Sequence, residues 1–541
     1  MNRVRHLRMY DLHSWTGLAI GLLIYIVTFT GCVALIYGEL EPWEDPAKRI
    51  ALPSTPIGIH EPFTKWVDTN LAPIADGEAE VEFLMLIYPS QHRPYYSGYM
   101  HGGPKGGEHA DYSVRWHPVT GEPLPERGDG LTEWILGFHT DLMWPAALGG
   151  KVAGEALVGV VGIALLLSII SGVIIHMKIK EEIFTLRYLR SVRLKWQDTH
   201  KILGLWLLPF YTMISFTGAV LGLIALLAPI IAVLAFKGDQ EALIEAVLGS
   251  PAEPAGIVAP MTSLDMIGAH HRTGQPPARV SIKNWGDEAA EYDVMYPAKT
   301  ELAIFDTVTL SGVTGDIIKD SSVNTLSAAT RTSSTLSPLH FGTFGGIWLK
   351  GFYFVLGLSL AAVTATGIMM WTERRLNGNV GARTTSFYRR LSRLSVGIMM
   401  GLPVASASIF YLDKLYIGSE GARLAWTGWT YFIAWGACTA YALRRPNEYQ
   451  TVRQLMALVG GLMVGLPFVN MLATGDVFLG DLAAGTGWAW ADFLFILVGA
   501  LTIYVSRTLP AKRPEKKKKR RSITTTDTSK AAPQPHTAPA E

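Results

Sequence analysis

Long apolar runs, each bounded by polar or basic stretches, dominate the pattern of hydrophobic and polar positions along this chain. A hydrocarbon core about 30 Å thick needs roughly 20 apolar residues of helix. About eight runs reach that length, and they predict a mainly α membrane protein with about eight transmembrane helices. The expected spans cover residues 12–38, 152–177, 200–235, 345–371, 392–416, 424–443, 451–472 and 487–507.

Two long polar segments, residues 39–150 and 236–344, interrupt this series of spans. Each contains short runs rich in β-branched and aromatic residues, such as residues 80–88 and 291–296. Both segments are long enough for a small domain, so we expect two small α+β domains outside the membrane. The span at 200–235 is either one tilted helix or two pieces broken near Pro209.

The composition supports a membrane location and narrows the chemistry. Hydrophobic residues make up 49% of the 541 residues and charged residues only 17%, against about 25% charged in soluble proteins. This excludes a disordered protein, a disulfide-stapled secreted domain and a nucleic-acid binder. The two cysteines, Cys32 and Cys438, cannot form a CxxC pair, a CxxCH haem attachment or a four-cysteine iron–sulfur site. Any redox chemistry must therefore use other ligands.

Lys and Arg gather on one side of the predicted spans. If there are eight spans, all the basic stretches fall on the same side, which the positive-inside rule makes cytoplasmic. Both termini are then cytoplasmic, and the tail at 508–541 is expected to be disordered and to bind anionic membrane lipid. The basic stretches are the N-terminus, loops 178–199 and 372–391, the turn at 444–450 and the tail.

An internal repeat relates the first two spans to the next two. Its two copies run in the same orientation, which implies a pseudo-two-fold axis along the membrane normal. The first two matches along the chain, 11–18 with 198–205 and 29–31 with 216–218, have the same offset of 187 residues. The matching pieces are 11–18 with 198–205, 29–31 with 216–218, 138–140 with 339–341, and 171–176 with 366–371.

Four histidines occupy equivalent places in the two copies. The axis puts His13 opposite His200 near the cytoplasmic surface, and His139 opposite His340 near the outer surface. Ionisable residues inside membranes are costly and usually mark function. We interpret each pair as the axial ligands of one b-type haem, because neutral imidazole holds haem iron and a helical bundle supplies facing side chains. The alternative is that these are interfacial histidines that reach head groups or backbone carbonyls.

Further residues surround the cytoplasmic pair. Gly17 follows His13 by one helical turn, and Gly204 follows His200 in the same way. These small residues leave room for a flat, bulky group beside the rings. His176 also lies at cytoplasmic depth, and it either replaces a ligand of that pair or contacts a haem propionate. Asp11 and Asp198 either orient the neighbouring histidines or act as helix N-caps.

For several residues of the outer segments, the sequence gives only weaker predictions of a functional role. Glu133, Trp134, Asp141 and Trp144 flank the outer pair in sequence and are expected to line a substrate cleft. The remaining outer histidines show no tight metal-ligand spacing. Those from residue 92 to residue 117 could bind a metal, but solvated loop histidines are the preferred interpretation. These histidines are His60, His92, His101, His109, His117, His270 and His271.

Taken together, the two helix starts, the Phe-Thr-Gly triplets and the histidine motifs resemble the PepSY-associated transmembrane family of iron-regulated bacterial inner-membrane proteins. The resemblance covers roughly residues 1–376. It implies a four-helix, pseudo-two-fold bundle that binds two haem b groups, beneath periplasmic PepSY-like domains. It also implies a reductase that passes electrons to a ferric siderophore or ferric chelate and releases ferrous iron.

The chain departs from that pattern beyond residue 376. The four C-terminal spans contain no histidine, so they bind a partner or quinol, or only support the bundle. A packing role is expected for Asp476, Asp481, Trp488 and Trp490. No GxGxxG follows a strand, there is no P-loop, and the cytoplasmic loops are short. Membrane quinol or a separate reductase is therefore the expected electron donor.

The expected organisation has seven parts and leaves two rival functions. One rival is a haem-free PepSY protein that inhibits a protease or senses a ligand, and the other is a transporter. The parts are helix 1 at 1–38, a domain at 39–150, helices 2 and 3 at 151–235, a domain at 236–344, helix 4 at 345–376, four further helices at 392–507 and the tail at 508–541.

Overall fold

The computed structural model describes most of the chain, including the expected spans except for residue 177. Residues 512–541 of the expected tail and most of the loop at 178–199 lie outside the described residues, as do His92, His270 and His271. The described residues are 3–72, 79–90, 93–104, 107–125, 130–176, 184, 192–239, 243, 253–269, 272, 274–297, 305–321, 328–376, 382–483 and 486–511.

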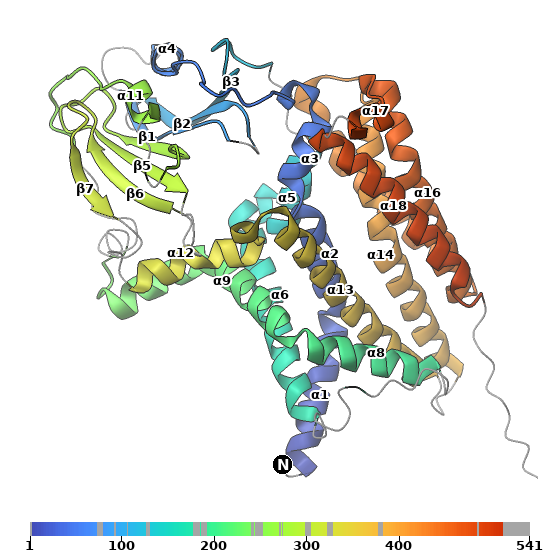
Figure 1. The fold of residues 1–541 in the computed structure, drawn as a ribbon. Coiled ribbons are helices and arrows are strands. Elements are labelled where there is room, and N and C mark those ends of the chain that lie inside the picture. Colours follow the sequence, from blue (N-terminus) through green and yellow to red (C-terminus); the bar gives the residue numbers. More distant parts are fainter. Residues whose placement is uncertain are drawn as a thin grey trace, which may run out of the picture.

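Long apolar helices form a bundle with a β-sheet at one end and the N-terminus at the other (Figure 1). Among the described residues, six helices are long and apolar enough to cross a membrane, and a bent pair of helices makes up to seven. The six are α6 Gly150–Ile175, α9 Leu208–Ala235, α13 Gly346–Leu376, α14 Ala382–Leu415, α16 Glu448–Thr474 and α18 Gly487–Thr508.

Two of the expected spans are bent or broken. The first forms α1 (Arg3–Ala19) and α2 (Gly21–Ala34), which meet at an angle of 61°. The span expected at 200–235 is broken between α8 (Val192–Trp206) and α9, two residues before Pro209. Proline at the start of a helix is tolerated because it has no N–H to leave unpaired there.

The expected span at 424–443 forms α15 (Arg423–Arg444), which packs along α14. Its tryptophan, tyrosine and threonine residues keep it out of the set of helices that contain a membrane-length stretch of high hydropathy. The structure therefore supports six or seven spans by length and apolarity. An eighth span stays a prediction.

Shorter helices connect the bundle to the sheet. Two of them carry candidate histidines: α5 (Leu131–Thr140) contacts α2 and α3, and α12 (Ala328–Phe341) contacts α9. The other short helices are α3 Tyr37–Glu44, η1 Pro46–Lys48, α4 His60–Leu71, η3 Ala146–Leu148, α11 Leu264–Ala269, η4 Thr343–Gly345, η5 Glu420–Ala422 and α17 Phe478–Ala483.

Both long polar segments contribute strands, as their alternating patterns predict, but the strands form one sheet. All neighbours in the sheet are antiparallel, in the order β3-β2-β1-β4-β5-β6-β7. The strands are β1 Ala79–Ile87, β2 Tyr96–Pro104, β3 Ala110–Trp116, β4 Arg279–Lys283, β5 Glu291–Pro297, β6 Phe305–Ser311 and β7 Ile317–Ser321.

The two segments are joined along β1 and β4, where Leu84 pairs with Ile282 and Leu86 with Val280. A shared core packs α4 and α11 on one face of this sheet. Asp265 of α11 also accepts hydrogen bonds from the first backbone N–H groups of α4. The two segments therefore share one continuous β layer, in which pairing removes two exposed strand edges. Their division into two small domains stays a prediction.

The C-terminal helices α14, α15, α16 and α18 pack beside the repeated half of the bundle (Figure 1). Their apolar side chains share a core with α2, α3 and α5. This contact places the C-terminal part of the chain against the helix that carries His139.

Candidate functional site

The four repeat-related histidines form two facing pairs. The rings of His13 on α1 and His200 on α8 have centroids 6.1 Å apart, with an angle of 71° between the ring planes. The rings of His139 on α5 and His340 on α12 have centroids 6.4 Å apart and are nearly parallel, at 14°. We call the first the far-side pair and the second the sheet-side pair.

The two pairs lie at different levels along α6. The His13 ring lies against Gly172, three residues before α6 ends. On the sheet side, Asp141, two residues after His139, lies against Gly154. Ala219, next to the glycine beneath His340, lies against Gly162. These levels are 10 to 18 residues from Gly172, or roughly 15–27 Å at 1.5 Å per residue, so the pairs are well separated along the bundle.

A glycine on a neighbouring helix supports each histidine ring. A Cβ atom at any of these four positions would come within about 3 Å of the ring, closer than ordinary van der Waals contact. The same repeat positions supply the glycine in both copies. The shortest distances are 2.8 Å from Gly31 to His139, 3.0 Å from Gly218 to His340, 3.1 Å from Gly367 to His200 and 3.2 Å from Gly172 to His13.

Hydrogen bonds at Nδ1 fix the orientation of the far-side rings. Nδ1 of His13 lies 2.9 Å from the carbonyl oxygen of Ser168, and Nδ1 of His200 lies 2.8 Å from that of Val363. A carbonyl oxygen only accepts, so Nδ1 carries the proton in each ring. The lone pair then resides on Nε2, the arrangement found in metal-bound histidines.

The sheet-side rings have the same tautomer. Nδ1 of His340 lies 2.9 Å from Oγ1 of Thr217, whose own hydrogen is directed to the carbonyl of Met213, so the hydroxyl accepts from the ring. Nδ1 of His139 lies 3.5 Å from Oγ1 of Thr30, whose own hydrogen is directed to the carbonyl of Ile26, so this hydroxyl also accepts from the ring. Burial lowers the pKa of His139 to about 4 and that of His340 to about 3, so both rings are neutral near pH 7.

The spacing of each pair fits two imidazoles on one metal ion. Two rings bonded through nitrogen at about 2 Å on opposite sides of an ion have centroids roughly 6 Å apart, close to the observed 6.1 and 6.4 Å. A Cβ at Gly17 or Gly204 would meet no neighbouring atom within 4 Å, which leaves open space beside the far-side pair. The residues present therefore fit a flat metal cofactor such as haem.

His176 lies four residues after Gly172, the α6 residue beside the His13 ring. It is the C-cap residue of α6, and its backbone N–H donates to the carbonyl of Val173. The far-side ring contact is made by His13 and His200. Ligation by His176, or its contact with a haem propionate, stays a prediction.

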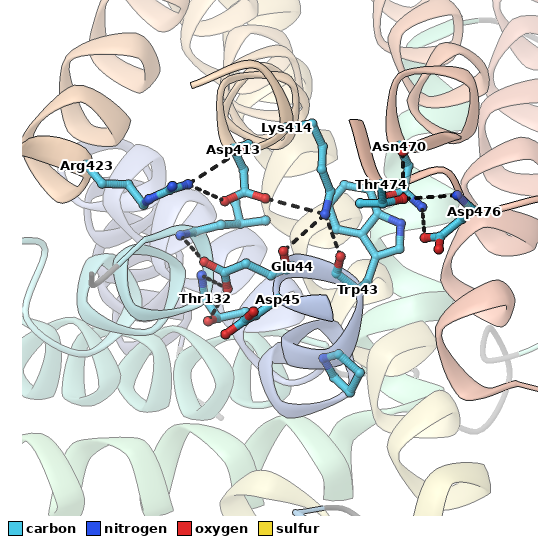
Figure 2. Close-up of polar contacts among 12 residues, drawn as sticks. Trp43, Glu44, Asp45, Thr132, Asp413, Lys414, Arg423, Asn470, Thr474 and Asp476 are labelled. Atoms are coloured by element: carbon cyan, nitrogen blue, oxygen red, sulfur yellow. Dashed lines mark hydrogen bonds and ion pairs between the residues drawn. The ribbon is translucent and has the colours of Figure 1, made fainter. Parts of the chain in front are cut away.

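A buried carboxylate holds the start of the helix that carries His139. Glu44 accepts hydrogen bonds from the backbone N–H groups of Leu131 and Thr132 at 2.9 and 3.1 Å, and from the Thr132 hydroxyl (Figure 2). These N–H groups are the unpaired donors that begin any helix. Glu44 is 4% exposed, so this cap fixes α5 inside the protein.

The C-terminal helices reinforce this cap through buried charges. Lys414 of α14 donates to the backbone carbonyls of Trp43 and Glu44, and its ammonium lies 4.0 Å from the Trp43 ring centroid (Figure 2). Asp413 pairs with Lys414 and with Arg423. The network ties α14 and α15 to the segment that positions α5.

Two of the outer-rim residues of the C-terminal part, Asp476 and Trp488, make packing contacts, whereas Trp490 is 52% exposed. Arg49 forms an ion pair with Asp476 at 2.7 Å and stacks its guanidinium over Trp488. Asn470 donates to both Asp476 and Asp492. These contacts fasten the chain after α3 to α16 and α18.

Two sequence-based interpretations are wrong. Trp134 does not line an open cleft: it is 2% exposed and packs against Phe138 and Tyr431, with ring centroids 4.8 and 4.3 Å away. Asp11 and Asp198 are not helix N-caps, because α1 begins at Arg3 and α8 at Val192. Asp198 is fully buried and pairs with Lys201 instead.

Sequence reasoning found the histidines but missed what supports them. The glycines of the Phe-Thr-Gly triplets and of the Ser-Gly and Thr-Gly helix ends were visible as repeat matches, and that repetition was the available signal. Their contact with the rings required the packing of separate helices. The Glu44 cap had no comparable signal, because Glu44 lies 87 residues before Leu131.

Comparison with known proteins places this arrangement in a family. The family described as PepSY-associated TM region matches residues 10–374, which include all four paired histidines. The chain is also similar to an uncharacterized protein of Pseudomonas aeruginosa, with 28% identity over 321 residues that cover 57% of this chain and 80% of the relative. Because the family match covers about two thirds of a chain with several membrane-spanning helices, this multi-pass membrane protein belongs to the PepSY-associated TM family.

Proposed function

We propose that this protein is a di-haem b reductase of the bacterial inner membrane that passes electrons to a ferric siderophore or ferric chelate in the periplasm. His13 and His200 would hold one haem, and His139 and His340 the other. One electron reduces each ferric ion, and ferrous iron leaves because it binds oxygen-donor chelators more weakly. In this orientation both termini are cytoplasmic and the sheet is periplasmic.

The observation that carries the proposal is the geometry of the two histidine pairs. Both pairs have the ring spacing of bis-imidazole ligation, two of the four Nδ1 atoms donate to backbone carbonyls, and the other two face threonine hydroxyls. Interfacial histidines that merely reach head groups or bond a backbone carbonyl through one nitrogen would have no reason to face each other twice. The equivalent contacts in both copies of the repeat therefore support ligation over the interfacial alternative.

The protein's own residues prepare the two sites. The carbonyls of Ser168 and Val363 hold the Nδ1 protons of the far-side rings and leave their Nε2 lone pairs for a metal. The glycines beneath the rings allow helices to approach closely enough to fix them. Two haem b groups would supply one-electron redox chemistry at the two membrane surfaces.

Membrane quinol or a separate reductase is proposed as the electron donor. The C-terminal helices support the bundle on one side, because they anchor α5 through Lys414 and the Glu44 cap. A packing role in the proposed reductase is sufficient to account for these contacts.

The first experiment measures haem in the purified full-length protein. Pyridine haemochrome quantitation is expected to give two b-type haems per chain. His13→Ala or His200→Ala should remove one haem, and His139→Ala or His340→Ala the other. Ferric citrate is then added to the dithionite-reduced protein, with ferrous iron trapped by ferrozine.

The outcomes separate the proposed reductase from its rivals. Oxidation of the reduced haems with one ferrous ion formed per electron supports the reductase. If purified chains bind no haem, the haem-free regulatory protein is favoured. If all four histidine variants keep two haems with unchanged spectra, the ligand assignment is wrong. Uptake of a labelled chelate into vesicles without reduction would favour a transporter.

A further inference from the structure

A second group of metal-ligating side chains lies on the sheet, away from both histidine pairs. Glu82 of β1, His101 of β2 and His109 just before β3 place one ligand atom each within 4.8 Å of one another. We propose that these three residues bind a divalent transition-metal ion. The proposal does not depend on the reductase function.

The distances between the ligand atoms fit a small ion. One carboxylate oxygen of Glu82 lies 2.9 Å from Nδ1 of His109, and the other lies 3.7 Å from Nε2 of His101. In a tetrahedral site with bonds of about 2.0–2.1 Å, ligand atoms are roughly 3.3–3.4 Å apart. The observed distances lie on either side of that value, so small side-chain rotations would bring these ligand atoms to the spacing of a tetrahedral site.

The sheet itself brings the three residues together. The register between β1 and β2 shifts between Val81 and Phe83, which leaves Glu82 outside the regular pairing, as in a β-bulge. A bulge redirects the side chain of its extra residue and is common beside functional sites. Phe83 pairs with His101, so the bulged Glu82 side chain reaches a ring on the adjacent strand.

A further carboxylate orients one of the proposed ligands. Asp111 lies directly across from His101 on β3, and its Oδ1 is 2.7 Å from Nδ1 of that ring. This contact keeps the proton on Nδ1 and leaves Nε2 of His101 as the ligand atom. Carboxylate–histidine–metal triads use the same arrangement.

The ligand types and their exposure define the class of ion. Two imidazoles with one carboxylate suit zinc, ferrous iron, cobalt or nickel, whereas magnesium and calcium prefer oxygen ligands. The side chain of Glu82 is 56% exposed and that of His101 37%, so the site opens to solvent. His101 and Asp111 also line a cavity of about 360 Å³ on this face. The arrangement suits an exchangeable ion better than a closed structural one.

The test uses zinc as the probe and the full-length protein with any affinity tag removed. Equilibrium dialysis against Zn²⁺ in 5 mM Mg²⁺ compares the wild type with the double variant His101→Ala/His109→Ala and with Glu82→Gln. The matched control is His117→Ala, because His117 is an outer histidine whose Nδ1 accepts backbone N–H groups of its own turn.

The wild type and the His117→Ala control are expected to bind one more zinc ion per chain than the double variant. Glu82→Gln should weaken that binding at least tenfold. Thermal unfolding in EDTA is expected to be the same for all variants, with zinc raising the midpoint only in the wild type and the control. Equal zinc binding by the wild type and the double variant would overturn the proposal, as would displacement of zinc by Mg²⁺.

Discussion

Gly31→Ala is the most direct test of how the sheet-side histidine pair is built. The added Cβ would lie 2.8 Å from Cε1 of His139 and 3.2 Å from its Nδ1. Carbon atoms pack best at about 3.5–4.0 Å, so the ring must retreat by roughly 0.7–1.2 Å. Metal–ligand distances tolerate only about 0.2 Å.

The expected effect follows from that displacement. Overpacking a tight contact costs about 1–3 kcal/mol, which corresponds to roughly 5–150-fold weaker haem binding. Alanine is the better helix former by about 1 kcal/mol, so loss of haem could not be blamed on a weaker α2 helix. The haem content of Gly31→Ala should fall from two toward one per chain.

The assay is pyridine haemochrome quantitation with reduced-minus-oxidised spectra. Gly351→Ala is the matched control, because a Cβ at that position on α13 would meet no atom within 4 Å. Gly172→Ala should instead affect the far-side pair, and more weakly, since its Cβ would lie 3.2 Å from His13. If Gly31→Ala retains two haems with unchanged spectra, or if Gly351→Ala loses as much haem, the reasoning is refuted.

Three further changes test other parts of the structure. Gly17→Leu should lower far-side haem content, because the new side chain fills the open space beside the ring; an unchanged haem count would contradict this. Glu44→Gln should cost about 1–3 kcal/mol by leaving a helix-start N–H unpaired, with thermal unfolding as the measurement and exposed Glu122→Gln as the control. Lys414→Met removes one partner of a buried ion pair, and should destabilise by about 3–5 kcal/mol, whereas Lys151→Met, 73% exposed, should unfold like the wild type.

The repeat explains why so much of the candidate site was predictable. Two copies in the same orientation must pack around an axis, which brings equivalent residues face to face. The chain places His13 and His200 at matching positions, and the structure brings their rings together. Their role as haem ligands stays a prediction that the haem measurements test.

Helix interruptions were less predictable than helix positions. Hydropathy locates apolar runs because burial in lipid depends on composition. It carries little information on the 61° bend between α1 and α2, which depends on how helices pack. Pro209 was a visible signal for the break between α8 and α9, because proline favours a helix start.

The sheet-borne metal ligands show a different limit of sequence reasoning. The spacing of His101 and His109 resembles that of solvated loop histidines, and Glu82 lies on another strand. Only strand pairing, with a register shift at Glu82, puts the three side chains side by side. Ligand sets assembled across strands leave no compact motif in the sequence.

By itself, the sequence determined the membrane environment, the repeat and the identity of the paired histidines, because each depends on composition or on a pattern that recurs along the chain. The tertiary structure decided the rest. It joined two distant segments into one sheet through β1 and β4, seated each ring on a glycine of another helix, and capped α5 with Glu44. These features are contacts between residues far apart in the chain, and their energies depend on packing that no local pattern encodes.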